Sequence, residues 1–236
     1  MSRVLLYDLE TTGDKPQRHR IMQFAGLACD ALTLDIVEEF EVKVHFDHRL
    51  AYELEALANN VFGHTLYPEG VPRGEPSKDF PRGMPLFAKG DSARWNALGV
   101  PSVAARLQVD AFIRRHSTVQ CESKRTGRAY KTARSGGHNV ATFDSQFMSA
   151  WYEGKFVPLG FKLLDTLQLA SWVEYLLDPV ACGSRDAELN MKALCEKHGI
   201  PLIGAHDALV DVHANRKLVL ALREELRREL PKVTAW

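Results

Sequence analysis

The spacing of hydrophobic and polar residues predicts strands at the start of the chain and one short helix after them. Short apolar runs carry β-branched and aromatic residues partly in alternation, which is typical of strands. We expect three sequential strands, forming an antiparallel meander, over residues 3–9, 21–29 and 36–46. Leu54, Leu57 and Ala58 then recur at helical spacing, so a short helix is expected over residues 50–59.

The next stretch, approximately residues 60–101, is rich in proline and glycine. Proline lacks the backbone N–H that helices and sheets need, so this composition predicts neither element from about residue 63 onward. A structureless loop of this length inside a domain is usually functional or mobile. The prolines concerned are Pro68, Pro72, Pro76, Pro81, Pro85 and Pro101.

Helical periodicity dominates the second half of the chain. An amphipathic helix is expected over residues 102–116, with Ser102 available as its cap and one side formed by Val103, Leu107, Phe112 and Ile113. A strand interrupted by a basic hairpin at approximately 120–136 follows, and a buried strand ends at Asp165. Further helices are expected over residues 143–152, 166–177, 187–198 and 205–229. This order favours a single α/β domain over residues 1–236, with helices on both faces of a mixed sheet.

Composition and charge narrow the class of protein. Hydrophobic residues make up 45% and charged residues 25% of the 236 residues, as in ordinary soluble folded proteins. Thirty basic residues balance thirty acidic ones, so the chain has no overall basic field. A polyanion must therefore be bound by a local group of basic residues. The four cysteines lack zinc-site or disulfide spacing, and the first apolar run is too short for a signal peptide or a membrane span. A cytoplasmic setting is therefore expected.

Candidate chemistry begins at the end of the first strand. Asp8 and Glu10 are two residues apart, so their carboxylates point to the same face of a strand. Two neighbouring like charges repel unless a cation lies between them. The alternative for this segment alone is a pair of exposed strand-end acids.

Two further segments carry acids or histidine. Asp144 stands at the start of a helix, where an ordinary N-cap or first-turn acid, favoured by the helix dipole, is the alternative interpretation. His206 and Asp211 lie five residues apart in the last expected helix, close enough to address one cavity. A structural or solvated histidine is the alternative there. Asp165 is expected to cap a helix, and Asp207 to point elsewhere around its helix.

Together these segments resemble the DEDDh family of 3′-to-5′ exonucleases. The resemblance lies in D-x-E-T-T-G at residues 8–13, H-N-x-x-x-F-D at 138–144 and H-D-A-x-x-D at 206–211. Within the family the chain looks most like the nuclease domain of bacterial exonuclease I, which shares Gln23-Phe24-Ala25 and the extra residue before Asp144. The likeness covers about residues 3–59 and 102–225, and the Pro-rich insertion is not part of it. It implies a ribonuclease H-like fold with a mixed five-stranded sheet flanked by helices.

The resemblance also implies roles for particular residues. Four carboxylates would hold two Mg²⁺ or Mn²⁺ ions, and His206 would take a proton from the attacking water. The implied metal ligands are Asp8, Glu10, Asp144 and Asp211. The implied contacts to the terminal nucleotide are Leu9, Thr11, Thr12, Gln23, His138, Asn139 and Phe143.

The resemblance implies single-stranded nucleic acid 3′ ends as the partner, with DNA preferred and roles in proofreading or DNA repair. The basic hairpin, with Lys124, Arg125 and Arg128, either reaches toward the phosphate backbone or is a solvated loop. An exoribonuclease like ribonuclease T or oligoribonuclease is one alternative, and a noncatalytic polymerase-associated module is another. A phosphodiesterase for small nucleotides is a third. A polymerase or a second copy of the chain is a possible protein partner, and no membrane partner is expected.

Overall fold

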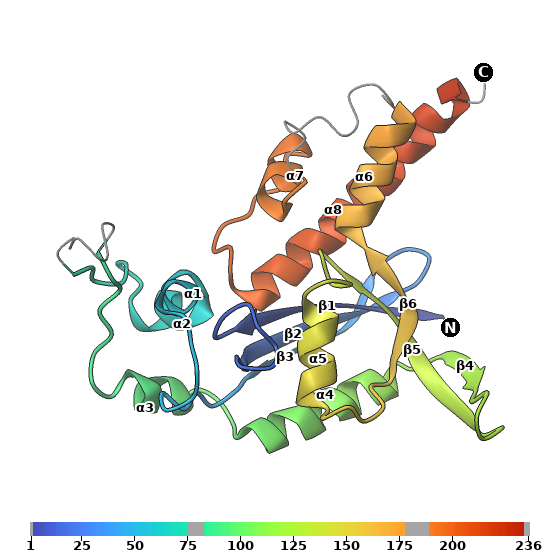
Figure 1. The fold of residues 1–236 in the computed structure, drawn as a ribbon. Helices are drawn as coiled ribbons and strands as arrows, with labels where there is room; N and C mark the ends of the chain where they lie inside the picture. Colours follow the sequence, from blue (N-terminus) through green and yellow to red (C-terminus); the bar gives the residue numbers. More distant parts are fainter. Residues whose placement is uncertain (1, 75–82, 178–188, 234–236) are drawn as a thin grey trace.

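One mixed sheet of six strands organises the part of the chain that the structure describes (Figure 1). The computed structural model describes residues 2–74, 83–177 and 189–233. Pro76, Pro81 and the start of the helix expected at residue 187 lie outside these ranges. The strands are β1 (Arg3–Thr11), β2 (Ile21–Asp30), β3 (Ile36–Lys43), β4 (Val119–Glu122), β5 (Ala129–Gly137) and β6 (Leu159–Asp165).

The topology confirms the expected fold class. The first three strands form the antiparallel meander, and the sheet continues through β5, which runs parallel to both β1 and β6. The strand order is β3-β2-β1-β5-β4, with β6 also paired to β5. One strand more than the expected five is present, because β4 pairs with the first half of β5 as a hairpin.

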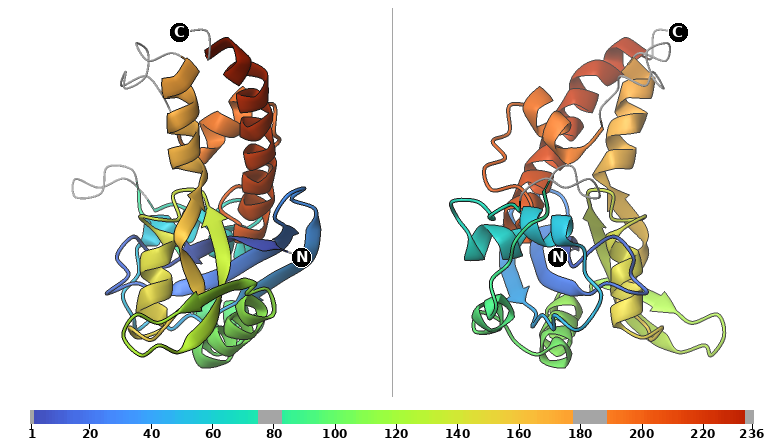
Figure 2. Two further views of the ribbon diagram at one scale, coloured as in Figure 1. Left: turned by 90° about the vertical axis from the view of Figure 1, so that its right-hand side faces the viewer. Right: turned by 60° about the vertical axis from the view of Figure 1, so that its left-hand side comes forward.

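Eight helices are described, and they cover both faces of the sheet (Figure 2). The core residues of α4 and α5 pack on one face, and those of α8 pack on the other. α6 and α8 extend past the sheet side by side, with α7 packed against them. The helices are α1 (Leu54–Asn59), α2 (Val61–Leu66), α3 (Asp91–Asn96), α4 (Ser102–Arg115), α5 (Asp144–Trp151), α6 (Thr166–Leu177), α7 (Met191–Lys197) and α8 (Ala208–Val233).

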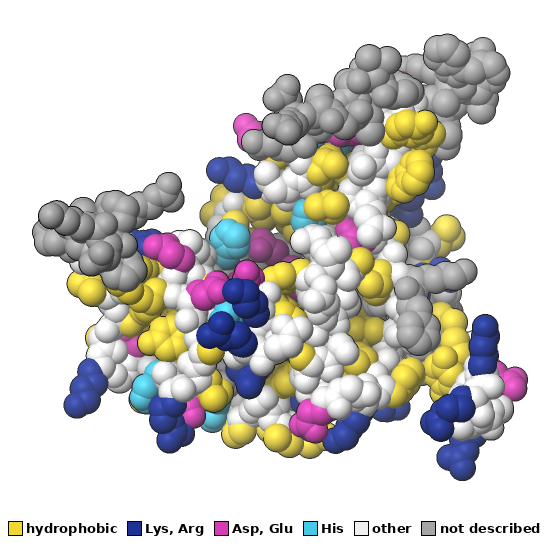
Figure 3. All heavy atoms as spheres, viewed as in Figure 1, with side chains coloured by type: hydrophobic (Ala, Val, Ile, Leu, Met, Phe, Trp, Pro, Cys, Tyr) yellow, Lys and Arg dark blue, Asp and Glu magenta, His cyan; other side chains and the backbone are white. Residues whose placement is uncertain are grey.

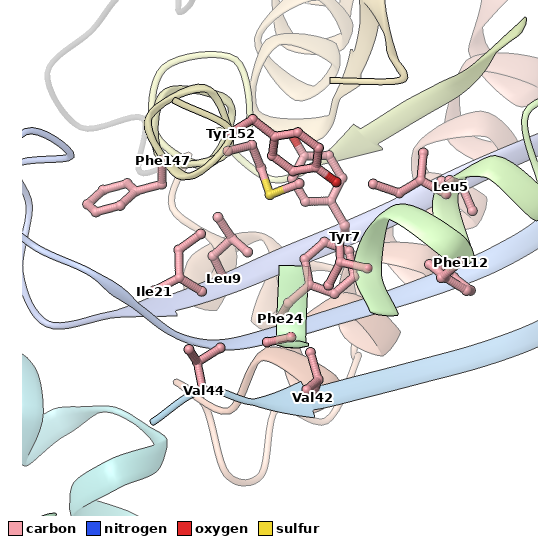
Figure 4. Packing of buried hydrophobic residues seen from close by; sticks show 14 of the residues in the cluster. Leu5, Tyr7, Leu9, Ile21, Phe24, Val42, Val44, Phe112, Phe147 and Tyr152 are labelled. Atoms are coloured by element: carbon pink, nitrogen blue, oxygen red, sulfur yellow. The ribbon is translucent and has the colours of Figure 1, made fainter. Parts of the chain in front are cut away.

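Alternation along β1 separates the two cores. Leu5, Tyr7 and Leu9 point toward α4 and α5, where they pack with Phe112 and Phe147 (Figure 4). The intervening residues Val4 and Leu6 point to the opposite face and pack with Ala208 and Val212 of α8. Asp8 and Glu10 continue this second series, so the period of two places them next to the start of α8.

The Pro-rich stretch is more regular than predicted, and that prediction is wrong for its described part. Its prolines leave windows free of proline in which α2 and α3 form. Trp95 of α3 is fully buried, and its indole N–H donates to the Val44 carbonyl oxygen at 2.8 Å. It packs with Phe62 of α2 in a separate hydrophobic cluster beside the sheet. Burial of large aromatic side chains therefore orders the flanks of this insertion.

Two predictions for α4 are also wrong. Val103 and Leu107 are 62% and 65% exposed, because the helix turns Ala105, Val109 and Phe112 toward the sheet instead. Ser102 is the first helical residue and not the cap; its hydroxyl accepts a hydrogen bond from the Trp151 indole N–H at 2.8 Å.

Candidate catalytic site

Asp8 and Glu10 meet the start of α8 at one end of the sheet. Because they follow Val4 and Leu6 on the same face of β1, they reach past the apolar packing of α8 into a cavity. Glu10 is buried, and Asp8 is half-buried on the cavity wall. These two acids are therefore not the exposed strand-end pair that was the alternative interpretation.

His206 lies before α8 and not within it, which corrects the sequence-based placement. The helix begins at Ala208, and Asp207 accepts a hydrogen bond from the Leu209 N–H at 3.0 Å in its first turn. His206 has a φ of 67°, in the left-handed region that residues other than glycine rarely adopt. Its N–H donates to Oδ2 of Asp211 at 3.0 Å, which fixes this conformation. Strained backbone of this kind concentrates at functional sites.

Asp144 enters the same site from the opposite side of β1. It is the first residue of α5, and Phe143 holds the N-cap position, so Asp144 is not a cap. It is an acid of the first helical turn, as the alternative interpretation allowed, but it is buried. Its side chain is 3% exposed, and Oδ1 has no hydrogen-bond partner within the described protein. Burial raises the pKa of Asp144 to about 7, although the N–H groups of Asp144 itself and Leu9 oppose that shift.

Burial and neighbouring acidic groups raise the pKa values of all four carboxyl groups. Burial, and then the charges of Asp144 and Glu10, raise the pKa of Asp8 well above its usual range. Burial and the charge of Asp211 do the same for Glu10. Burial also raises the pKa of Asp211 to about 6, although the His206 N–H opposes the shift. In the protein alone, these groups cannot all ionise at neutral pH without cost.

The donor set fits divalent cations. Ligand atoms of Glu10, His206 and Asp211 all lie within 4.8 Å of one another. Asp144 and Asp211 each leave one carboxylate oxygen buried without a partner in the described protein. Hard dications such as Mg²⁺ and Mn²⁺ take oxygen ligands, and a cation among the acids would remove both the repulsion and the unsatisfied oxygens. The arrangement can therefore hold metal ions.

The surrounding cavity has a volume of about 420 Å³. Ten of the residues predicted from the sequence line it, so the structure brings together most of the candidate set. They are Asp8, Leu9, Glu10, Thr11, His138, Asn139, Phe143, Asp144, His206 and Asp211. Asn139, like His206, has a positive φ, at 57°. Asp165 holds this segment by accepting hydrogen bonds from the Asn139 and Ala141 N–H groups at 3.1 and 3.0 Å, and it also caps α6 as expected.

Two predicted contacts are buried away from the cavity. Gln23 is fully buried, and its amide binds Glu41, Asp207 and the Ala208 N–H, so it anchors the start of α8. Thr12 is 1% exposed, and its hydroxyl accepts from the Arg20 N–H at 3.0 Å and donates to the Ala51 carbonyl oxygen at 3.2 Å. Their side chains support the site instead of lining it.

The basic hairpin is distant from the cavity. β5 ends at Gly137, next to the cavity residue His138, whereas the hairpin joins its other end at Ala129. Eight steps along a strand span roughly 26 Å. The hairpin projects from the body on the side away from α1 (Figure 1). Lys124, Arg125 and Arg128 are therefore not brought to the cavity.

Several lining residues had not been predicted from the sequence. Glu53, Ala56, Asn59 and Asn60 come from α1 and its ends, and Met191 from α7; Asp14 follows β1. Asn60 is buried, and its amide donates to the Thr11 carbonyl oxygen at 2.9 Å while accepting from the Phe62 N–H at 2.9 Å. No local motif marks these residues, because they reach the cavity through the packing of α1 and α7.

Comparison with known proteins gives a partial match to one family model and a match in fold to solved structures. Residues 5–58 match the model of the RNase_T exonuclease family, and no curated protein sequence matches the chain. The strongest evidence comes from solved structures of exonuclease I. The Escherichia coli enzyme in complex with a dT13 oligonucleotide aligns over 98% of this chain and 43% of its own, with 17% identity and a TM-score of 0.66.

Two further structures agree. The zinc-bound form of the E. coli enzyme with single-stranded DNA covers 99% of this chain and 42% of its own, with 17% identity and a TM-score of 0.62. A moderately thermophilic exonuclease I from Methylocaldum szegediense covers 99% and 42%, with 21% identity and a TM-score of 0.61. The resemblance in fold to exonuclease I is confirmed, and the chain spans less than half the length of these relatives. In the described ranges, no helix is both long and apolar enough to cross a membrane.

Proposed function

From its exonuclease family match and its exonuclease I fold, we propose that this chain is a metal-dependent 3′-to-5′ exonuclease acting on single-stranded DNA. It releases nucleoside 5′-monophosphates from the 3′ end. The observation that carries the proposal is the convergence of four buried or half-buried carboxyl groups from three separate segments, two of them with unsatisfied oxygens, beside His206. We also propose that residues 1–236 act as a single domain.

The residues have distinct roles in the proposed reaction. Asp8, Glu10, Asp144 and Asp211 hold two divalent cations, Mg²⁺ or Mn²⁺. When bound, the two ions activate a water and stabilise the leaving 3′ oxygen of an in-line displacement. His206 is exposed at the cavity mouth and accepts the proton of the attacking water through its imidazole.

The terminal nucleotide occupies the cavity between β1 and α1. Leu9, Thr11, His138, Asn139 and Phe143 line this space and would contact its sugar, base and phosphate. The exposed residues Asp14 and His206 line the cavity, so it opens to solvent and can admit the end of a chain. We propose DNA as the substrate in preference to RNA, because structures of E. coli exonuclease I, which has this fold, hold dT13, dA13 and dA16 oligonucleotides.

A labelled-strand assay tests the proposal. Single-stranded DNA carrying a 5′ label should give a ladder of shortening products with Mg²⁺, and none with a chelator. The same strand with a 3′ label should release labelled mononucleotide first. Asp8→Asn should abolish both signals, whereas Asp35→Asn, the same change at an exposed residue just before β3, should leave both intact. Release of the 5′ label first, or unchanged cleavage by Asp8→Asn, would overturn the proposal. Matched RNA strands in the same assay decide the sugar preference.

A further inference from the structure

The loop between β1 and β2 places exposed positive charge at the cavity. We call residues 12–20 the basic loop; it carries Lys15, Arg18 and Arg20, all exposed. Gly13 and Asp14 of the same loop line the cavity, so Lys15 follows directly on a lining residue. Within the described ranges none of the three cations forms an ion pair, whereas most other arginines there do. Lys and Arg side chains lie directly beside the acidic ones at the hollow on this face (Figure 3).

The basic loop is held in one conformation by its own hydrogen bonds. The Thr12 N–H donates to the Arg20 carbonyl oxygen at 2.9 Å, and the Arg20 N–H donates to the Thr12 hydroxyl at 3.0 Å, which closes its base. Inside the loop, His19 is 5% exposed, and its Nδ1 accepts from the Lys15 N–H at 3.0 Å. This buried histidine ties the two ends of the segment 15–19 together and so orders the loop. The cations are therefore presented on an ordered platform.

The three cations offset negative charge at the cavity mouth. The cavity mouth carries the exposed acids Asp14 and Glu53, which add to the four carboxyl groups inside. The chain has no net charge, so a polyanion approaching this mouth is repelled unless cations lie close by. The basic hairpin lies at the other end of β5 and cannot meet the phosphates nearest the cavity.

We propose that the basic loop binds the phosphates of the single strand immediately 5′ of the scissile bond. The inference rests on the proposed function and names the surface along which the strand enters. Lys15 and Arg18 contact phosphate oxygens, so they contribute affinity and salt dependence without reading base or sugar. The basic loop also lines a second hollow of about 460 Å³, through Gln17 and Arg20 together with Trp151 of α5.

The double variant Lys15→Ala/Arg18→Ala tests this path against a matched control, Lys124→Ala/Arg125→Ala, which removes the same charge from the basic hairpin. For the basic-loop variant, KM for a single-stranded oligonucleotide should rise roughly tenfold near physiological salt, with kcat little changed. The slope of log(kcat/KM) against log[salt] should become shallower by about 1.4, since each phosphate contact to a single strand contributes about 0.7. The hairpin variant should match the wild type in both.

A substrate without upstream phosphates separates this inference from the proposed function. Hydrolysis of the p-nitrophenyl ester of thymidine 5′-monophosphate should be equal in wild type and both double variants, and equal Tm values should confirm folding. Lys15→Gln/Arg18→Gln, which keeps side-chain length, should reproduce the loss. An active wild type whose salt slope is unaffected by the loop variants, or affected more by the hairpin variant, would overturn this inference alone. An inactive wild type on every substrate would overturn the proposed function.

Discussion

The carboxyl group of Asp144 is expected to destabilise the metal-free protein at neutral and alkaline pH, so Asp144→Asn should be more stable than the wild type. Burial raises its pKa from 3.8 to about 7. Each pKa unit corresponds to about 1.4 kcal/mol, so ionising this group in the folded state costs about 4 kcal/mol above pH 7. The amide introduced by the substitution is buried without a full set of hydrogen-bond partners, which costs about 1–3 kcal/mol and offsets part of the gain in stability.

The sign of the effect depends on pH. Well below pH 4 the group is protonated in both the folded and the unfolded protein, so the carboxyl costs nothing. As the pH rises toward 7 the unfolded chain ionises freely while the folded chain resists, and stability falls. The net gain for Asp144→Asn is therefore about 2 kcal/mol near pH 8, which corresponds to a Tm increase of roughly 4–8 °C for a chain of this length. Near pH 4 the variant should be no more stable than the wild type.

Thermal unfolding with a chelator present, across this pH range, measures the difference. Asp35→Asn serves as the control because it makes the same chemical change at an exposed residue, and its Tm should follow the wild type at every pH. Mn²⁺ should raise the Tm of the wild type and much less that of Asp144→Asn, because a cation stabilises only the state that binds it. A Tm for Asp144→Asn that lies below the wild type by the same amount at pH 4 and pH 8 would refute the reasoning.

Three further variants probe how the site is built. His206→Ala and His206→Gly should both lose activity. In urea unfolding the glycine variant should be more stable than the alanine variant by about 1 kcal/mol, because glycine adopts a φ of 67° without strain. Equal stabilities of the two variants would count against backbone strain at this position. Gly13→Ala should unfold at a lower temperature and lose activity. Gly13 has a φ of 155°, and an added Cβ would lie 2.4 Å from the His19 ring. An unchanged Tm would contradict this. Asn60→Ala should lower the free energy of unfolding by about 2–3 kcal/mol and should also lower kcat, because it removes both the cap of α2 and the hydrogen bond to the Thr11 carbonyl oxygen. A loss of stability with unchanged kcat would show that Asn60 supports the fold but not the reaction.

The strand-borne part of the site could be predicted from the sequence because its signal is local. Asp8 and Glu10 follow the apolar positions Val4 and Leu6 at a period of two, and the structure puts all four on the face that meets α8. Burial of the alternating apolar residues fixes this register, since a shift by one residue would turn every side chain to the other face. The antiparallel meander follows from the three strands that succeed one another along the chain, and the mixed sheet follows from the later alternation of helices and strands.

The spacing of apolar residues alone does not show where the last helix begins, and that spacing therefore predicts His206 inside it. Apolar spacing extends the last helix back to residue 205, but Asp207 precedes the first buried helical residue, Ala208, and ends that extension by bonding the Leu209 N–H. An aspartate directly before an apolar run is a start signal for a helix, and it is visible in the sequence. The other restraint, from Gln23 to the Ala208 N–H, joins residues 185 positions apart and leaves no local trace.

The direction of the parallel strands explains which basic segment lies at the site. β1, β5 and β6 are parallel, so their carboxyl ends at Thr11, Gly137 and Asp165 share one edge of the sheet. A segment that follows one of these strands emerges at the site, and a segment that precedes one lies at the opposite edge. The basic hairpin precedes the last part of β5, whereas the basic loop follows β1. The number of basic residues along the sequence favours the basic hairpin as the segment that binds the strand, but strand direction favours the basic loop. Of the two segments, only the basic loop contributes residues to the cavity that the carboxylates line.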